Sequence, residues 1–212
     1  THLGHSFPTR RSSDLCAFVD INRIPIFNIG GVYMSNILEA SGMNKKIELG
    51  KGNELHILKN VNLEIEKGEF VSVMGPSGSG KSTLLYNISG MDRITSGSVR
   101  FKDSEIGALK EEELAKIRLR NMGFIFQDIN LLKNLSVIDN VMFPAFVLKD
   151  VNKDVLNQKA KKLLKMTGIE KLADNNINQT SGGQLQRAGI CRALINDPDI
   201  IFGDEPTGAL DS

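Results

Sequence analysis

The chain has 212 residues, with 26 Lys and Arg against 25 Asp and Glu, which leaves a formal net charge of +1. This balance argues against a protein that binds nucleic acid mainly through its phosphates, because such proteins carry a basic excess. The longest apolar stretches, such as residues 143–148, fall far short of the roughly 20 residues that a membrane-spanning helix needs. Only two cysteines are present, Cys16 and Cys191, which excludes a disulfide framework and favours a reducing compartment.

Residues 1–33 differ in character from the rest of the chain. Residues 5–15 have no helical or strand periodicity and resemble a translated sequencing adapter, and residues 16–33 resemble translated upstream sequence. We therefore expect residues 1–33 to be non-native and the natural start to be Met34. The alternative is a polar, disordered N-terminal arm.

Three elements are predicted in the next part of the chain. Apolar and polar residues alternate between positions 55 and 66, which predicts a strand with one buried face. Residues 70–74 form a short apolar run that ends just before Gly75, which is typical of a buried strand in a parallel sheet. Residues 82–89 are predicted to form a helix.

The remaining predicted elements are short strands and longer helices. The strands are 99–101 at a sheet edge and the buried segments 123–126 and 200–203. The helices are 109–120, 137–148, a segment that opens at Asn152 or Asp154 and ends near Gly168, and 184–196. Ser136 is the expected N-cap of the second helix, and Pro144 is expected to allow a kink in it. Residues 132–180 are expected to form a helical subdomain inserted between strands.

A glycine-rich loop follows the strand predicted at 70–74. Backbone N–H groups of such a loop point at a phosphate, and the next helix adds its positive N-terminal end. The pattern G-x-x-x-x-G-K-[ST] predicts that Lys81 reaches the β- and γ-phosphates and that the Ser82 hydroxyl binds Mg²⁺. A loop without chemical purpose is the alternative, and the flanking strand and helix argue against it. The residues expected to bind nucleotide here are Gly75, Pro76, Ser77, Gly78, Ser79, Gly80, Lys81, Ser82 and Thr83.

Two carboxylates end the last predicted strand. The apolar residues 200–203 hold this strand in a sheet, so that Asp204 and Glu205 emerge at its end. In P-loop enzymes the first such acid orients Mg²⁺, and the second can polarise the attacking water as a general base. Taken alone, the pattern is more often that of a strand running into a solvated loop. Together with the upstream loop it predicts a catalytic site.

A further motif, Ser181, Gly182, Gly183 and Gln184, opens the last predicted helix. With this motif the chain resembles the ATP-binding-cassette (ABC) ATPases, whose signature is this Ser-Gly-Gly-Gln sequence at a helix N-terminus. The usual leading Leu is Thr180 here, a minor departure because the phosphate-facing atoms are on Ser181 and Gly183. Ser181 alone could be a simple N-cap, but that interpretation does not explain the whole set of motifs.

The resemblance covers about residues 38–212 and implies an α/β fold. This fold is a P-loop NTPase core of the ABC ATPase type, with an inserted helical subdomain and an N-terminal antiparallel β region. Residues 34–212 are then an ABC ATPase domain, with ATP and Mg²⁺ as cofactors and ATP hydrolysis as the activity. In the family, two copies close head to tail, and the signature motif of one copy binds the γ-phosphate held by the other.

The resemblance also implies individual roles. Gln127, after the strand predicted at 123–126, matches the glutamine that contacts Mg²⁺ and the attacking water, and Asp211 matches a residue that contacts the other copy and its nucleotide. The implied catalytic residues are Lys81, Gln127 and Glu205. The implied Mg²⁺ ligands are Ser82, Gln127 and Asp204.

Two departures from the family pattern stand out. Ile47 occupies the position where family members usually carry an aromatic residue that stacks on adenine, so stacking is expected to be weaker or supplied by a neighbour. The family's switch histidine is expected after Glu205, but no histidine follows it. We therefore expect the chain to be truncated at its C-terminus and to hydrolyse little ATP by itself.

Within the family, residues 123–132 and 203–211 look like the group that serves lipoprotein release, macrolide export and antimicrobial-peptide export or resistance. This resemblance implies a separate membrane permease as partner, no nucleic acid, and a position on the cytoplasmic face of a bacterial plasma membrane. The expected substrates are peptides, lipoproteins or drugs. The alternative is a regulatory cassette of a cell-division-type complex that signals without transport. A soluble cassette of translation or DNA repair is disfavoured, because neither tandem cassettes nor long insertions are visible.

Overall fold

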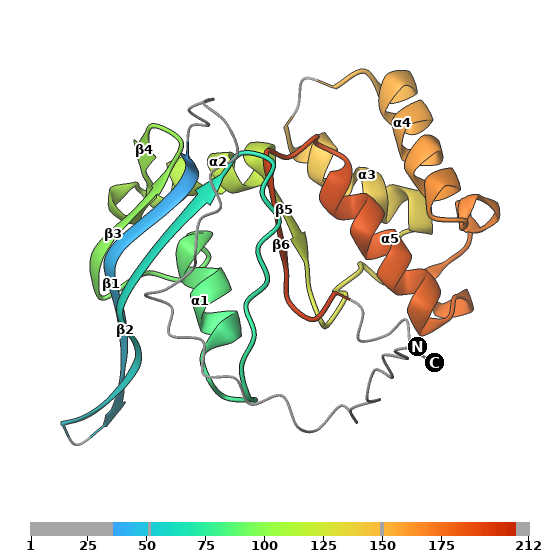
Figure 1. Cartoon of the computed structure of the whole chain (residues 1–212). Helices are drawn as coiled ribbons and strands as arrows, with labels where there is room; N and C mark the ends of the chain where they lie inside the picture. Colours follow the sequence, from blue (N-terminus) through green and yellow to red (C-terminus); the bar gives the residue numbers. More distant parts are fainter. Residues whose placement is uncertain (1–35, 51, 149–150, 207–212) are drawn as a thin grey trace, which may run out of the picture.

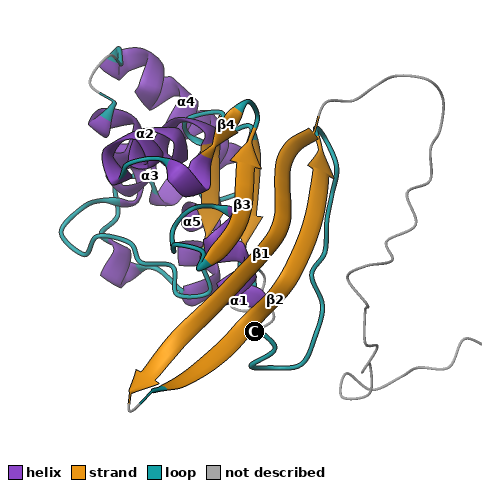
Figure 2. Cartoon of the chain, turned by 90° about the vertical axis from the view of Figure 1, so that its left-hand side faces the viewer, coloured by secondary structure: helices purple, strands orange, loops and turns teal. Residues whose placement is uncertain are grey.

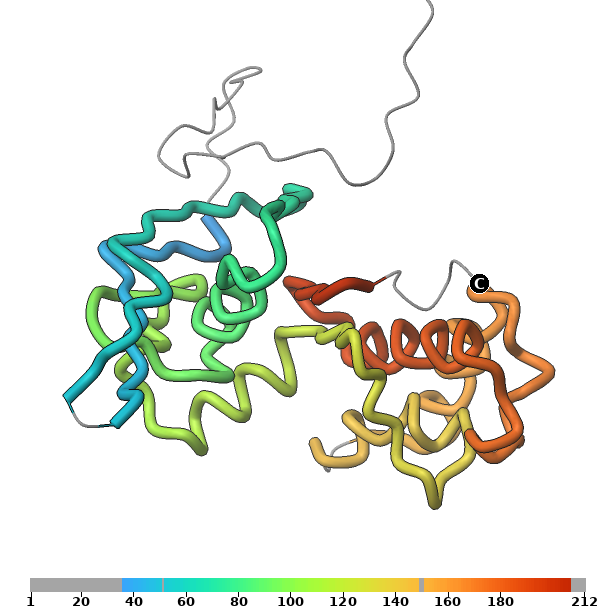
Figure 3. Tube along the Cα trace, turned by 90° about the horizontal axis from the view of Figure 1, so that it is seen from below, coloured from blue at the N-terminus to red at the C-terminus, as the bar shows by residue number. Residues whose placement is uncertain are grey.

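The computed structural model describes residues 36–50, 52–148 and 151–206, so residues 1–33 and Asp211 lie outside the described residues. Figure 1 shows an antiparallel sheet on one side, helices on the other, and parallel strands between them. Figure 3 shows the same division from below. The two parts have separate hydrophobic cores.

The antiparallel sheet is built on a long hairpin of β1 (Asn36–Gly50) and β2 (Asn53–Glu66). Figure 2 shows this hairpin extending beyond the rest of the sheet. β3 (Ser96–Phe101) pairs with the other edge of β1, and β4 (Ser104–Glu105) pairs with β3, which gives the order β2-β1-β3-β4. The strand predicted at 55–66 is confirmed as part of β2, with Leu58, Val61, Leu63 and Ile65 buried. The alternation is regular only from Val61 onward, because the register with β1 shifts before it, and Leu55 is exposed. The prediction of an edge strand at 99–101 is wrong, since β4 covers the outer side of β3.

Helices cover one face of this sheet. They are α1 (Lys81–Ile88), the short 3-10 helix η1 (Ile106–Ala108) and α2 (Glu111–Asn121). Leu84 and Ile88 of α1 and Leu114 of α2 are buried in the same core as the sheet residues. The charges of α2 follow its dipole, with three glutamates in the first turn and arginines in the last.

The second core is formed by three longer helices and two 3-10 helices. These are α3 (Val137–Val147), α4 (Lys153–Met166), η2 (Glu170–Leu172), η3 (Ile177–Gln179) and α5 (Gly182–Leu194). Ser136 caps α3 as expected, since its side chain accepts from the Asp139 N–H, and Asn152 rather than Asp154 caps α4. No helix among the described residues has the length and apolarity to cross a bilayer.

Two parallel strands, β5 (Met122–Ile125) and β6 (Ile200–Gly203), lie between the two cores. The C-terminal part of α5 packs closely on β5, because a Cβ at Gly123 would lie only 2.6 Å from the carbonyl oxygen of Ala193. The strand predicted at 200–203 is confirmed, but it is only partly buried. Phe202 is inside, whereas Ile201 is half exposed.

The strand predicted at 70–74 is wrong in the described structure. This segment is irregular, with Phe70 92% exposed and Met74 68% exposed. A strand requires a neighbour for its N–H and C=O groups, and the described sheet around β5 and β6 has two strands, neither of which pairs with it. The apolar run fits a buried strand, but among the described strands none pairs with it, and of its side chains Val71 is the one that packs against the first core.

Candidate functional site

The glycine-rich loop leads directly into α1 and is folded tightly. Gly78 and Gly80 have φ values of 76° and 92°, in the left-handed region that glycine adopts without strain. A Cβ at Gly75 would lie 2.8 Å from Ser79 Oγ, and one at Gly80 would lie 3.1 Å from Ile57 Cγ2. The loop therefore packs against itself and against β2 in a way that needs glycine at these positions.

Lys81 lies back across this loop. Its Nζ donates to the carbonyl oxygens of Gly75, at 3.0 Å, and Pro76, at 2.9 Å. Among the described residues no side chain caps the N-terminus of α1, so its first-turn N–H groups remain available to an anion. The ammonium and the helix end thus flank the space that the loop encloses, an arrangement suited to phosphate.

Gln127 and Glu205 meet at the carboxyl ends of β5 and β6. Gln127 Nε2 donates to Glu205 Oε2 at 2.7 Å, although the two residues are 78 positions apart in the chain. The Asp204 N–H donates to the Ile125 carbonyl at 2.9 Å, which fixes the start of the Glu205 loop against β5. The sheet therefore brings an amide and a carboxylate together where both loops leave it.

The backbone around Glu205 is unusual. Glu205 has a φ of 48°, a left-handed conformation that is uncommon and strained for a residue with a side chain. The next residue, Pro206, packs against Gly203, where a Cβ would lie 3.3 Å from Pro206 Cγ. The Pro206 carbonyl accepts a 2.8 Å hydrogen bond from Nε2 of Gln186, a buried residue of α5 that the sequence analysis did not identify.

Asp204 lies close to α1. A small cavity is lined by Tyr86 of α1, Phe124, Phe202 and Asp204. Burial first, and then the nearby Asp204 carboxylate, raise the pKa of the Tyr86 phenol above its ordinary value. The phenol therefore keeps its proton at neutral pH and can donate toward Asp204. Tyr86 was also missed from the sequence.

The three residues assigned to Mg²⁺ offer a fitting donor set. Ser82 supplies a hydroxyl, Asp204 a carboxylate and Gln127 an amide, and Mg²⁺ prefers such oxygen ligands together with water and phosphate. Because Gln127 uses its amide nitrogen on Glu205, its oxygen remains free to face a cation. In the described part of the chain, no cluster of three His, Cys, Asp or Glu residues points to a different metal site.

Ser181 begins α5 as a capping box. Its Oγ accepts from the Gln184 N–H at 3.4 Å, and its own N–H donates to Gln184 Oε1 at 2.8 Å. A Cβ at Gly182 would meet nothing within 4 Å, so this helix end is open to the surroundings. Figures 1 and 3 place α1 and α5 on opposite sides of β5 and β6. Within one chain the two helices are therefore separated by these strands.

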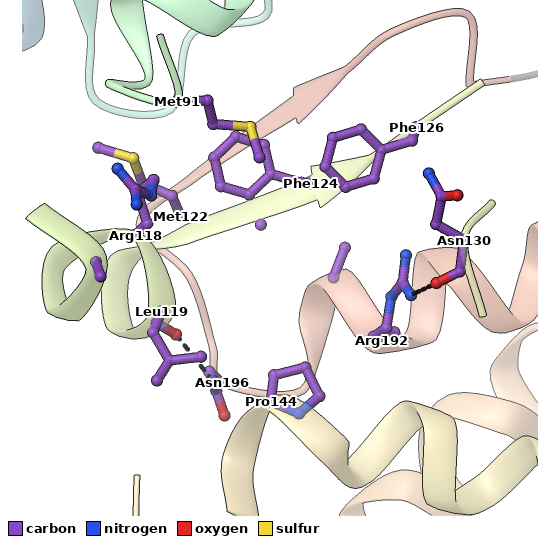
Figure 4. A pocket seen from close by; sticks show the side chains of 13 residues that line it. Met91, Arg118, Leu119, Met122, Phe124, Phe126, Asn130, Pro144, Arg192 and Asn196 are labelled. Carbon is purple, nitrogen blue, oxygen red and sulfur yellow. Dashed lines mark hydrogen bonds between the residues drawn. The ribbon is translucent and has the colours of Figure 1, made fainter. Parts of the chain in front are cut away.

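Arg192 of α5 holds the loop that follows Gln127. Its Nη1 donates to the Asn130 carbonyl and its Nη2 to the Ile129 carbonyl, both at 2.7 Å, and Figure 4 shows the first of these bonds. A Cβ at Gly189 would lie 3.0 Å from Ile129 Cγ2, so the loop also packs closely on the helix. This contact was not predicted from the sequence.

A cavity of about 510 Å³ lies between the two cores, with Arg192 in its wall. Its apolar lining comes from α2, β5 and α3, and Figure 4 shows Phe124, Phe126 and Pro144 around it. Arg118 is a second arginine in the wall.

Ile47 lies near the tip of the long hairpin. It pairs with Leu55 across the hairpin, and both side chains are partly exposed. Ile57 is two residues from Leu55 on the same face of β2, and it is the residue that packs against Gly80 of the glycine-rich loop. An apolar strip thus runs from the loop along the hairpin.

Comparison with known proteins gives one family. The ABC transporter family model matches residues 58–208. The bacitracin export ATP-binding protein BceA of Halalkalibacterium halodurans is 46% identical over 176 residues, which cover 83% of this chain and 69% of BceA. The lipoprotein-releasing system ATP-binding protein LolD 1 of Chlorobium chlorochromatii is 42% identical over 84% of this chain and 72% of its own length.

A solved structure agrees with these relatives. It is a dimer of the ATP-binding cassette MJ0796 in a post-hydrolysis state, bound to ADP and phosphate. The two chains have 42% sequence identity and a TM-score of 0.78, and the match covers 82% of this chain and 76% of the other. The α/β cassette fold expected from the sequence is thereby confirmed.

Proposed function

Because the chain belongs to the ABC transporter family, we propose that it binds and hydrolyses ATP at the site described above and powers a separate membrane permease. The observation that carries this proposal is the 2.7 Å contact between Gln127 and Glu205. It joins a carboxylate and an amide at the sheet end that also carries Asp204, and Asp204 lines a small cavity together with Tyr86 of α1.

Phosphate binding is the task of the loop from Gly75 to Thr83. When ATP binds, Lys81 exchanges the carbonyls of Gly75 and Pro76 for phosphate oxygens, which form stronger, charge-assisted hydrogen bonds. Mg²⁺, when held by Ser82, Gln127 and Asp204, supplies charge neutralisation to the phosphates.

Glu205 is the proposed general base. Its carboxylate takes a proton from a water molecule as the water oxygen attacks the γ-phosphorus, and the bond to the oxygen that bridges the β- and γ-phosphates breaks to release ADP. The Gln127 amide holds the carboxylate and leaves the Gln127 oxygen for the cation or the water. The chemistry is positioning of the water plus neutralisation of charge.

The adenine base is proposed to lie on the apolar strip of the hairpin. Ile47, Leu55 and Ile57 share one face of the hairpin, and Ile57 touches the loop that binds the phosphates. An aliphatic strip contacts a base through dispersion and apolar burial but lacks the contribution of a stacked ring. Base selection is therefore expected to be less strict than with an aromatic residue.

A second copy of the chain is the proposed partner at the signature motif. The open α5 end at Ser181, Gly182, Gly183 and Gln184 lies on the other side of the parallel strands from the chain's own loop. It can therefore reach only a nucleotide held by another copy, and Asp211 is assigned to the same contact. The dimeric form of the MJ0796 cassette supports this arrangement.

The proposed permease contact is the exposed side of α3. Phe143, Phe146 and Val147 are partly exposed and lie three and four residues apart, which puts them on one face. Pro144, the residue after Phe143 in the same helix, lines the cavity between the two cores. Binding there would hold the chain at the cytoplasmic face of the membrane. The names of the relatives, bacitracin export and lipoprotein release, support an exporter of peptides, lipoproteins or drugs.

Glu205→Gln in the whole protein tests the proposal. The amide cannot take the proton, so turnover should fall by at least about 100-fold while ATP still binds. Phosphate release measures turnover, and gel filtration with ATP should show ATP-bound dimers accumulating. Glu112→Gln, an exposed glutamate of α2, is the control and should keep normal turnover. Wild-type turnover in Glu205→Gln would remove Glu205 from this role.

A further inference from the structure

We infer that Gln186 is a positioning residue for Glu205: it fixes the backbone that follows the base, so that the carboxylate stays against Gln127. This inference rests on the proposed role of Glu205. It concerns a residue of α5 outside the phosphate loop and the signature motif.

Gln186 is a polar side chain in a buried place. It is 1% exposed, and the one side-chain hydrogen bond that it makes among the described residues is the 2.8 Å bond to the Pro206 carbonyl. Its Oε1 is buried and has no partner in the described part of the chain. An apolar residue of similar size would fill this space without burying an unpaired oxygen. The amide is therefore best explained by the bond that its nitrogen makes.

The segment that receives this bond needs support. Glu205 has the left-handed φ of 48°, and it precedes a proline, which restricts its backbone further. A strained conformation of this kind persists only when its surroundings fix it. The Asp204 N–H bond to Ile125 holds the backbone before Glu205, and the Gln186 bond holds it after Glu205.

Helix α5 also supports the loop of Gln127, the residue that contacts Glu205. Arg192, six residues after Gln186 on α5, donates to the carbonyls of Ile129 and Asn130 in the loop that follows Gln127. The loops of Gln127 and Glu205 are thus both anchored on α5. The 2.7 Å contact between Gln127 and Glu205 therefore depends on α5, which holds both loops in place. Gln186 is the residue of α5 that holds the Glu205 loop.

Gln186→Leu in the whole protein tests this inference. Leucine keeps most of the volume but cannot donate, so the Pro206 carbonyl is released and Glu205 is less well placed. We expect kcat for ATP hydrolysis to fall by about 10- to 100-fold, the cost of a misplaced catalytic group. The Kd for ATP should change less than about twofold, since the phosphate loop is untouched.

A control and a second readout separate positioning from loss of stability. Leu164→Ala removes a fully buried side chain of α4, far in sequence from the site, and should lower Tm without lowering kcat. In a Glu205→Gln background, Gln186→Leu should leave the residual single-turnover rate unchanged, because there is no base left to misplace.

The outcomes are distinguishable. If Glu205→Gln alone keeps normal turnover, the base assignment fails, and this inference fails with it. If Glu205→Gln is inactive but Gln186→Leu keeps the wild-type kcat, the proposed function stands and the positioning role is overturned. The role is also overturned if Leu164→Ala lowers kcat as much, or if Gln186→Leu lowers the residual rate again in the Glu205→Gln background.

Discussion

Lys81 is the residue whose substitution separates binding from chemistry. Its ammonium rests on two neutral carbonyls, and phosphate oxygens would replace them when nucleotide binds. Lys81→Ala should raise the Kd of a fluorescent ATP analogue by about 10- to 100-fold, since hydrogen bonds to charged groups contribute about 1.5–3 kcal/mol each. Lys102→Ala, which removes an ion pair between the turn after β3 and Asp199 just before β6, is the control. Unchanged affinity in Lys81→Ala would contradict the phosphate-binding assignment.

Single residues of the site differ in how well the sequence predicts them. The phosphate loop and the signature motif are contiguous, so their patterns can be read directly along the chain. Tyr86, Gln186 and Arg192 act through partners that are distant in sequence, and no local pattern indicates such contacts. One signal was available for the last two: they are polar residues on a helix whose other buried positions are small, namely Ala188, Gly189, Cys191 and Ala193.

Among the elements, the predicted helices were found within a few residues of their expected bounds, because caps and periodicity are local properties. The wrong prediction of a strand at residues 70–74 has a different cause. Apolar residues such as Phe70 and Met74 indicate that a segment can be buried, but whether it pairs depends on a neighbouring strand. A sequence pattern predicts that a segment can form a strand, whereas the presence of a neighbouring strand in the sheet determines whether it does.

Helix α5 gives a prediction at the same scale. Arg192→Ala removes two hydrogen bonds of a charged group from the loop after Gln127, which should destabilise the fold by about 3–6 kcal/mol, or about 1.5–3 kcal/mol for each bond. Urea unfolding measures this loss, and backbone hydrogen exchange of residues 128–133 should become faster. Arg192→Lys should restore only part of the lost stability, because an ammonium lacks the planar fork with which the guanidinium reaches two carbonyls.

Arg100→Ala on β3 is the control for this experiment, because Arg100 is exposed. It should leave both the unfolding free energy and the exchange of residues 128–133 unchanged. If Arg192→Ala behaves like Arg100→Ala, the loop is not held by α5.

At the scale of the whole molecule, the separation of α1 from the α5 end predicts how two copies must cooperate. Lys81→Ala copies lack a working phosphate loop, and Ser181→Arg copies lack a working signature motif. Each variant alone should be inactive, but an equal mixture should recover up to about one quarter of wild-type turnover, because half of the dimers are mixed and each has one complete site. No recovery on mixing would argue against a site shared between copies.

The position of α5 also has a thermodynamic consequence. The helix begins at Ser181, which faces the nucleotide of the other copy in the proposed dimer, and it anchors the loops of Gln127 and Glu205 in its own copy. Free-energy coupling between two sites is reciprocal. Suppose that a phosphate bound at Ser181 of one copy changes the affinity of that copy's phosphate loop for nucleotide, through α5 and the Glu205 loop. Nucleotide bound at the phosphate loop must then change the affinity of Ser181 for the phosphate by the same factor. The two sites would then not fill independently, and a recovery below one quarter in the mixture would measure their linkage.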